Sequence, residues 1–374
     1  MYAASECGHL DVVKYLLENI ANLSYKNSGL RSLNIASQNG HLGVMKHLLE
    51  ILFYSNLEKK GEKLSLMTAS ANGHIEAVKY LVDRGAPIDV KTGDGISPFW
   101  IASQNGHLDI VKHLVNMGSE INITDRYEWT PLTIANSKGH LSAVKYLLEQ
   151  GAFVDYEGDS EAKLLYIASE GGNVDTVKYS IKNGTHIDTR TGNVVTPLTI
   201  ASRNGHSEVV KTLIKGGVEI NAKSKDEKTA LHVASANGRL DIVRLLVLNG
   251  VNVLAKDEQG NTPLNIASQN GYLETANVLL EYCANVNLRT NWKWKALHMA
   301  SYRGYVEIMN ILLQNGADID APGLNQWTPL HKASLSGCFE AVDVLVQSGA
   351  DINAKTKDNG RFLKNVIVSR IPKL

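Results

Sequence analysis

A glycine returns every 33 residues along almost the whole chain. These glycines are Gly40, Gly73, Gly106, Gly139, Gly172, Gly205, Gly238, Gly271, Gly304 and Gly337, and Gly8 lies 32 residues before the first of them. The hexapeptide Ala-Ser-Gln-Asn-Gly-His occurs unchanged at 36–41 and at 102–107. Eleven copies of one repeat therefore account for most of the 374 residues. A fixed period of this length indicates a stacked array in which each repeat contacts its neighbours, and not a globule with one central core.

The charge balance argues against two classes of partner. Lys and Arg number 38, Asp and Glu also number 38, and the net charge is zero. Proteins that bind nucleic-acid phosphates usually carry a basic excess, and adsorption to anionic membranes needs one as well. Hydrophobic residues make up 44% of the chain, which is enough to build a continuous core through the repeats. We therefore expect neither nucleic acid nor a membrane as partner.

Cysteine usage and the absence of targeting segments indicate the compartment. Cys7, Cys283 and Cys338 are odd in number and fall in different repeats, so a disulfide framework is not expected. The first ten residues lack the basic and apolar regions of a secretory signal, and no apolar run approaches the roughly 18 residues of a membrane span. We expect an intracellular, cytoplasmic protein, with the nucleus as the alternative.

One copy, from Ser97 to Gly118, shows how the repeat folds. Ser97 is predicted to cap a short helix that starts at Pro98, where the missing N–H costs nothing, and that ends at the Asn-Gly of 105–106. A second helix is predicted over about 108–116, because its apolar residues recur at helical spacing. An extended turn over 119–128 leads to the next cap. Helices this short are marginal alone in water, so their stability must come from stacking.

Three rows of small or apolar residues recur with the period and predict an apolar spine. Alanine occupies 4, 36, 69, 102, 135, 168, 201, 234, 267, 300 and 333. Leu or Phe lies three residues earlier, at 33, 66, 99, 132, 165, 198, 231, 264, 297 and 330. Ile or Val occupies 88, 121, 154, 187, 220, 253, 286, 319 and 352. We expect alanine where helices approach closely and the other two rows to bury side chains in every repeat.

The motif Thr-Pro-Leu-x-x-Ala occurs at 130–135, 196–201, 262–267 and 328–333, and several repeats continue with Gly-His. With the 33-residue period, this pattern resembles the ankyrin repeat family over residues 1–354. The resemblance implies an all-α fold, a curved α-solenoid of antiparallel helix pairs joined by β-hairpin-like fingers. It also implies a non-enzymatic scaffold that binds proteins through its finger tips and concave face. We expect one array over 1–354, a degenerate partial repeat or cap over 355–374, and a monomer.

Some repeats depart from the pattern. The first repeat begins inside its first helix and is expected to be incomplete and to fray. Leu52-Phe53-Tyr54 replaces a closing glycine and is expected to prolong or distort a helix end. Residues 163–168 lack the cap hydroxyl and the proline, and Cys283 stands where other repeats have glycine. A last helix over about 363–369 is expected to cap the array.

The histidines and the isolated polar residues indicate structural roles and not catalytic or metal-binding roles. Six histidines share one position of the repeat, at 9, 41, 74, 107, 140 and 206. Neighbouring repeats should lie roughly 10 Å apart, too far for equivalent side chains to share one zinc ion. We expect these histidines, and those at 232, 298 and 331, to bond backbone groups. No nucleophile elbow, phosphate loop or His-Glu-x-x-His motif is present, so we expect no enzyme activity, metal or cofactor.

A row of basic residues on the second helix has two interpretations. It comprises Lys14, Lys46, Lys79, Lys112, Lys145, Lys178, Lys211 and Arg244. It could form a positive stripe along one face of the array. The favoured interpretation is a solvated helix face, because lysine is a good helix former and nearby acidic residues dilute the charge.

Aromatic residues give the best candidates for partner binding. Trp129, Trp294 and Trp327 share the position just before the helix cap, at the base of a finger, and Tyr127 and Trp292 lie two residues earlier. Tyr302, Arg303 and Leu335 depart from the polar pair that follows Ala-Ser in other repeats, while Trp100 adds bulk to a first helix. Aromatic side chains on a rigid frame are typical anchors, although packing against a neighbouring finger would also explain them. We expect the main binding patch over 290–340 and a second one at 127–129 with Trp100.

Three alternatives stay open. The array could be the targeting or regulatory arm of a larger catalytic or membrane-associated protein, of which this chain is a fragment. Turn asparagines such as Asn221, Asn287 and Asn353 could be hydroxylated, as the resemblance allows. The basic tail over 355–374 could contact an acidic partner, although a solvated cap or the start of a linker is the favoured interpretation.

Overall fold

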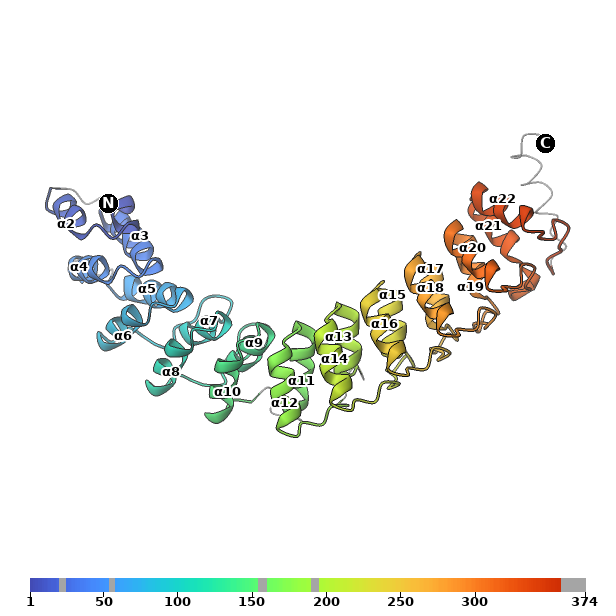
Figure 1. Cartoon of the computed structure of the whole chain (residues 1–374). Coiled ribbons are helices and arrows are strands. Elements are labelled where there is room, and N and C mark those ends of the chain that lie inside the picture. The colour runs from blue at the N-terminus through green and yellow to red at the C-terminus, as the bar shows by residue number, and fades with distance from the viewer. Residues whose placement is uncertain (20–24, 54–57, 154–159, 190–194, 358–374) are drawn as a thin grey trace. The chain divides into compact units, whose positions relative to one another are not determined.

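The computed structural model describes residues 1–19, 25–53, 58–153, 160–189 and 195–357. Over these residues it contains 22 α-helices, one short 3₁₀ helix and no strand. Successive helices pair into eleven repeats, and the first helices of neighbouring repeats contact each other within each block (Figure 1). Contacts divide the chain into an N-terminal block, Met1–Ser180, and a C-terminal block, Ile181–Leu374. The all-α solenoid of helix pairs that the family resemblance implied is confirmed.

The N-terminal block contains the first six helix pairs. They are α1 (Tyr2–Glu6) with α2 (Leu10–Asn19), α3 (Tyr25–Gln38) with α4 (Leu42–Phe53), α5 (Glu58–Asn72) with α6 (Ile75–Asp83), α7 (Pro98–Gln104) with α8 (Leu108–Asn116), α9 (Pro131–Ser137) with α10 (Leu141–Glu149), and α11 (Ser160–Gly171) with α12 (Val174–Lys182). The boundary between the two blocks falls inside α12.

The C-terminal block contains the other five pairs. They are α13 (Pro197–Asn204) with α14 (Ser207–Lys215), α15 (Ala230–Ala236) with α16 (Leu240–Leu248), α17 (Pro263–Asn270) with α18 (Leu273–Glu281), α19 (Ala296–Arg303) with α20 (Val306–Gln314), and α21 (Pro329–Ser336) with α22 (Phe339–Gln347). The 3₁₀ helix η1 (Leu324–Gln326) precedes α21.

The helix ends follow the predicted caps. Ser97 accepts a hydrogen bond from the backbone N–H of Trp100, and Pro98 is the first residue of α7. Thr130 makes the same bond with the N–H of Thr133 at the start of α9. Because the side-chain oxygen satisfies an N–H that has no partner inside the helix, each cap fixes where its helix begins.

The alanine and Leu/Phe rows form the core, as predicted. Every member of the Leu/Phe row is at most 1% exposed, and every alanine of its row from Ala36 to Ala333 is fully buried. The Ile/Val row differs from the prediction among its described members. Val286 is buried, but Ile88 and Ile121 are only half-buried and Ile352 is 47% exposed. These side chains lie in the loops between repeats, where helices cover one side only.

The loops that join repeats are here called fingers, and in the part of the chain that the structure describes they contain turns and no strand. In the finger before α9, the N–H of Asp125 donates to the carbonyl of Trp129 at 3.2 Å, and the N–H of Glu128 donates back to Asp125 at 3.1 Å. Single backbone bonds also join neighbouring fingers, such as that from Arg126 N–H to the Asp94 carbonyl. The predicted β-hairpin-like fingers are not observed as strands among the described residues.

A second set of contacts joins several repeats to the one before. Nε2 of His74 lies 2.7 Å from the carbonyl oxygen of Gln38, and Nε2 of His107 lies 3.0 Å from that of Ala71. His41 and His140 make the equivalent contact, and Arg239 makes it through Nε. The predicted bond to a backbone group is confirmed for the histidines at 41, 74, 107 and 140, and the acceptor is the end of the preceding first helix.

The irregular repeats have longer helices. Helix α4 has 12 residues where most second helices have nine, so Leu52 and Phe53 prolong it as predicted. Helix α11, which lacks the cap hydroxyl and the proline, starts earlier than its counterparts and also has 12 residues. Cys283 adopts a left-handed φ of 62° in place of glycine. Tyr54, Val154 and the predicted helix over 363–369 lie outside the described residues.

Candidate protein-binding surface

The predicted patch over 290–340 presents several exposed side chains. Trp292 is 59% exposed, Leu335 is 53% exposed and Tyr302 is 42% exposed, and Arg303 is exposed as well. Trp294 and Trp327 are half-buried. The patch therefore combines solvent-facing anchors with aromatic rings that pack into the protein.

Backbone bonds hold the two fingers of this patch. The N–H of Thr290 donates to the carbonyl of Trp294 at 2.8 Å, and the N–H of Gly323 donates to that of Trp327 at 2.8 Å. The N–H of Leu324 donates to the Trp292 carbonyl at 3.1 Å, which joins the second finger to the first. The ring of Trp292 is therefore exposed, while its backbone carbonyl is held by a hydrogen bond from the next finger.

Beside these fingers, three aromatic rings surround one ammonium group. Nζ of Lys332, on α21, lies 3.8 Å from the ring centroid of Trp294, 4.9 Å from that of Trp327 and 5.9 Å from that of Tyr302. We call Lys332 and these three rings the Lys332 cluster. Helix α19 supplies Tyr302, and the finger bases before α19 and α21 supply the tryptophans.

Lys332 is buried without an anionic partner among the described residues. The residue is only 8% exposed, and its ammonium group has ring faces but neither a hydrogen-bond acceptor nor a carboxylate within reach. Burial lowers the pKa of Lys332 below its ordinary value. A desolvated cation–π contact contributes about 2 kcal/mol, whereas burying a charge costs several kcal/mol, so the rings offset the burial only in part.

The sequence contained a signal for this cluster that the predictions did not use. Lys332 occupies a repeat position that is apolar or small in every other repeat, with Ile35, Ile101, Ile134, Ile167, Ile200, Val233, Ile266 and Met299 among its counterparts. Ala3 and Thr68 complete the row. A lysine is unexpected at a mostly apolar repeat position unless nearby side chains stabilise its charge. Trp294 and Trp327, which precede Lys332 in the sequence, provide such side chains.

Lys295, one repeat earlier, is a buried lysine with conventional partners. Its Nζ lies 3.0 Å from Oδ2 of Asp318 and 3.1 Å from Oδ1 of Asn287, and the residue is 5% exposed. Among the residues that the structure describes, Lys295 is thus paired with a carboxylate, whereas the ammonium group of Lys332 contacts aromatic faces alone.

The electrostatics around His298 reflect these two lysines. The pKa of His298 is lowered to about 4, mainly by burial and to a smaller extent by the positive charges of Lys332 and Lys295. The carbonyl of Trp327 lies 3.0 Å from Nε2 and raises the pKa of His298. Nδ1 accepts from the N–H of Lys295, so the neutral ring carries its proton on Nε2. Lys332 and Lys295 therefore both oppose protonation of His298.

The second predicted patch is partly interior. Tyr127 is 65% exposed, but Trp129 is half-buried, and Trp100 is 5% exposed with its Nε1 donating to the carbonyl of Trp129 at 2.9 Å. Arg126 stacks on the Tyr127 ring at 4.7 Å. Trp100 therefore supports the finger from beneath and does not lie on the surface where we expected it.

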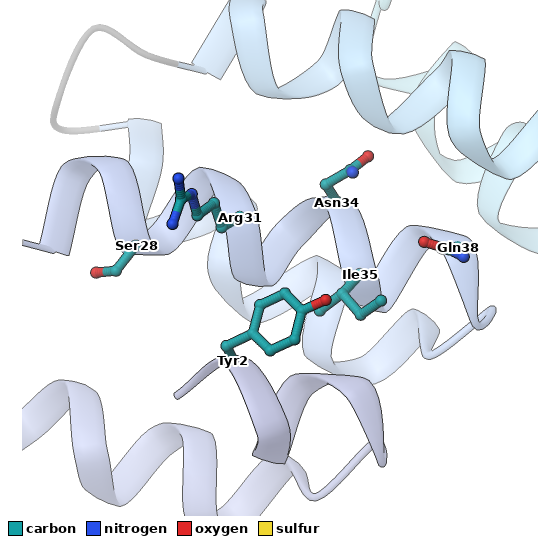
Figure 2. A pocket seen from close by; sticks show the side chains of 6 residues that line it. All are labelled: Tyr2, Ser28, Arg31, Asn34, Ile35 and Gln38. Carbon is teal, nitrogen blue, oxygen red and sulfur yellow. The ribbon is translucent and has the colours of Figure 1, made fainter.

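A hollow between α1 and α3 adds a candidate that the sequence did not reveal. This cavity of about 580 Å³ is lined by Tyr2, Ser28, Arg31, Asn34, Ile35 and Gln38. Figure 2 shows the Tyr2 ring beside Ile35, with polar side chains along α3. The hollow lies on first helices, which is where the family resemblance places partner contacts.

The basic row on the second helices is solvent-exposed along its full length. Lys79 pairs with Glu76 at 2.9 Å, and Lys112 lies over the ring of Tyr146 in the next repeat at 5.7 Å. Exposed pairs of this kind contribute little stability. Local acids and rings accompany the lysines, which agrees with the favoured interpretation of a solvated face.

In the described part of the chain, no three His, Cys, Asp or Glu side chains gather in a way that could hold a metal ion. None of the described helices combines the length and the apolar composition needed to cross a bilayer.

Comparison with known proteins identifies the repeat. The family model described as ankyrin repeats (three copies) matches residues 1–61, 66–158, 164–257, 216–290 and 283–356. These segments together cover nearly the whole array. No curated protein matched the chain.

Proposed function

We propose that this chain, which belongs to the ankyrin repeat family, is a non-enzymatic scaffold that binds partner proteins through its finger tips and first-helix surface. Ankyrin repeats are generally protein–protein interaction modules. We propose residues 290–340 as the principal binding surface. Free thiols at Cys7, Cys283 and Cys338 support a reducing, cytoplasmic setting.

The observation that carries the proposal is the exposure of Trp292, Tyr302 and Leu335 on a bonded framework. Large apolar side chains fixed near one another on a surface are typical of binding hot spots. Backbone bonds between the fingers and the packing of α19 on α21 hold this framework before any partner arrives. A preformed surface loses little conformational entropy on binding, so its contacts contribute more to affinity.

The test is affinity capture from the protein's own cells with a tagged full-length chain. The variant combines Trp292→Ala, Tyr302→Ala and Leu335→Ala, which removes exposed side chains and leaves the buried rows intact. Leu248→Ala is the control, because Leu248 is 68% exposed on α16 and lies outside 290–340. Captured proteins are quantified by mass spectrometry after circular dichroism has shown equal helicity.

The expected result is loss of at least one partner with the triple variant and retention with the control. Replacing each hot-spot residue should weaken binding by about 1–2 kcal/mol or more. If the triple variant captures every protein as well as the parent chain does, residues 290–340 are not the binding surface.

A further inference from the structure

We infer that the Lys332 cluster binds a carboxylate of an acidic partner segment that also carries apolar side chains. The inference rests on the proposed scaffold function and adds the chemistry of the partner. It concerns one place, where α19 and α21 pack together in the C-terminal block.

The first argument is the unpartnered charge. Lys332 is 8% exposed, and its Nζ contacts ring faces without any acceptor among the described residues. An ammonium group has three N–H donors, and aromatic faces satisfy none of them as an oxygen does. Lys295 is similarly buried, at 5% exposed, and has Asp318 as its carboxylate partner. The described residues provide no equivalent acid for Lys332, which leaves that place open to a carboxylate from outside.

The second argument is the sign of the local charge. Arg303 lies 5.9 Å from the centroid of Tyr302, the same ring that Lys332 approaches. The charge of Lys332 also acts on His298, whose protonation it opposes. An anion is therefore favoured at this place, and a cationic ligand would have to displace Lys332 from the rings.

The third argument is the apolar surface beside the charge. Tyr302 and Leu335 are 42% and 53% exposed, from α19 and α21 respectively, and Trp292 is 59% exposed on the adjoining finger. Tyr302 belongs to both the cluster and this exposed surface. A segment that alternates acidic and aliphatic residues would place carboxylates at Lys332 and Arg303 and apolar groups on these side chains.

The experiment uses three fluorescein-labelled peptides and the full-length chain. The acidic probe is Gly-Leu-Asp-Leu-Asp-Leu-Asp-Gly, and the two matched probes carry Asn or Lys in place of each Asp. Fluorescence anisotropy measures the dissociation constants at low and at physiological salt. We expect the acidic probe to bind about tenfold more tightly than the Asn probe and the Lys probe to bind least. Tighter binding of the Lys probe would overturn the inference, because the rings would then serve as a cation site.

Three substitutions assign the binding to Lys332. Lys332→Met removes the charge and keeps an unbranched side chain, as Met299 has at the equivalent position. We expect Lys332→Met to weaken binding of the acidic probe by about tenfold. Lys332→Arg keeps the charge and should retain most of the affinity for that probe. Lys215→Met is the control, because Lys215 is an exposed lysine of α14 in the same block. Melting curves establish that each variant is folded.

The outcomes separate this inference from the proposed function. If Lys332→Met binds the acidic probe as tightly as the parent chain does, Lys332 is not the anion site. The same conclusion follows if Lys332→Arg loses as much affinity for the acidic probe as Lys332→Met does. If the chain captures cellular partners through Trp292, Tyr302 and Leu335 but binds none of the probes, the acidic-segment inference fails and the scaffold function stands. Unchanged capture by that triple variant counts against the function itself.

Discussion

The imidazole of His107 lies directly against Gly73 of the preceding repeat. A Cβ atom on Gly73 would come within 2.8 Å of both Nδ1 and Cε1 of His107, and Gly73 itself has a left-handed φ of 82°. Glycine is therefore favoured at this position for two reasons. Its φ is left-handed, and a side chain would clash with the His107 ring that covers it. The ring in turn places Nε2 at 3.0 Å from the Ala71 carbonyl.

We expect Gly73→Ala to lower the free energy of unfolding by about 2–3 kcal/mol, because it combines backbone strain with displacement of the His107 ring. Gly85→Ala is the matched control. Gly85 has a φ of 88° but no neighbouring atom within 4 Å of its Cβ position, so only strain of about 1 kcal/mol remains. Urea unfolding followed by circular dichroism measures both variants. Equal losses for the two would mean that the contact between Gly73 and His107 contributes nothing.

Acid should destabilise the C-terminal block through His298. Burial lowers the pKa of His298 from its ordinary 6.5 to about 4, so between these values the unfolded chain binds more protons than the folded chain. The free energy of unfolding therefore falls as pH drops from 6.5 to about 4, by on the order of 3 kcal/mol from this group. His232 and His331, whose pKa values burial also lowers, act in the same direction.

The matched variant for this effect is His298→Asn. Asn265 occupies the equivalent position two residues into α17, and its Oδ1 accepts from the Thr262 N–H at 3.1 Å, so asparagine retains the cap acceptor without titrating. Urea midpoints measured from pH 7.5 to pH 4 should fall less steeply for the variant than for the parent chain. Parallel pH dependences would show that His298 does not titrate in this range.

Opposite changes in stability are expected for Lys332→Met and Lys295→Met. The first removes an unpaired buried charge from an apolar row, so we expect the free energy of unfolding to rise by about 1 kcal/mol. The second leaves Asn287 and Asp318 without their shared donor, and because Asp318 is half-exposed the loss should be about 1 kcal/mol. Thermal and urea midpoints measure both. A loss of stability in both variants would mean that the aromatic rings fully offset the burial of Lys332.

Features with local causes could be predicted from the sequence. Ser97 and Pro98 start α7 where the cap motif places it, and the helices of that repeat end within one residue of the predicted bounds. Such boundaries depend on hydrogen bonds within a few residues of the chain. The eleven helix pairs follow because the same local causes recur with the period.

Features that depend on neighbouring repeats were predicted less well. Trp100 was expected on the surface, but its ring lies beneath the finger that contains Trp129, a contact across 29 residues. The half-burial of the Ile/Val row depends on how much of each loop the helices cover. The predicted patch over 290–340 included both tryptophans but not Lys332, because the contact of the two rings with this side chain of α21 follows only from the packing of neighbouring repeats.

The contact between Gly73 and His107 has a consequence for how such a chain can change length. Each covering side chain reaches the glycine one repeat earlier, and the same pair of positions recurs 33 residues on. Deleting or duplicating one whole period between regular repeats such as the third, fourth and fifth restores an equivalent partner across the junction. Duplication of a whole repeat is therefore the change of length that restores this contact directly from the repeated sequence. A loop between helix pairs can absorb a smaller change, because His41 still covers Gly8 although Gly40 lies only 32 residues after Gly8.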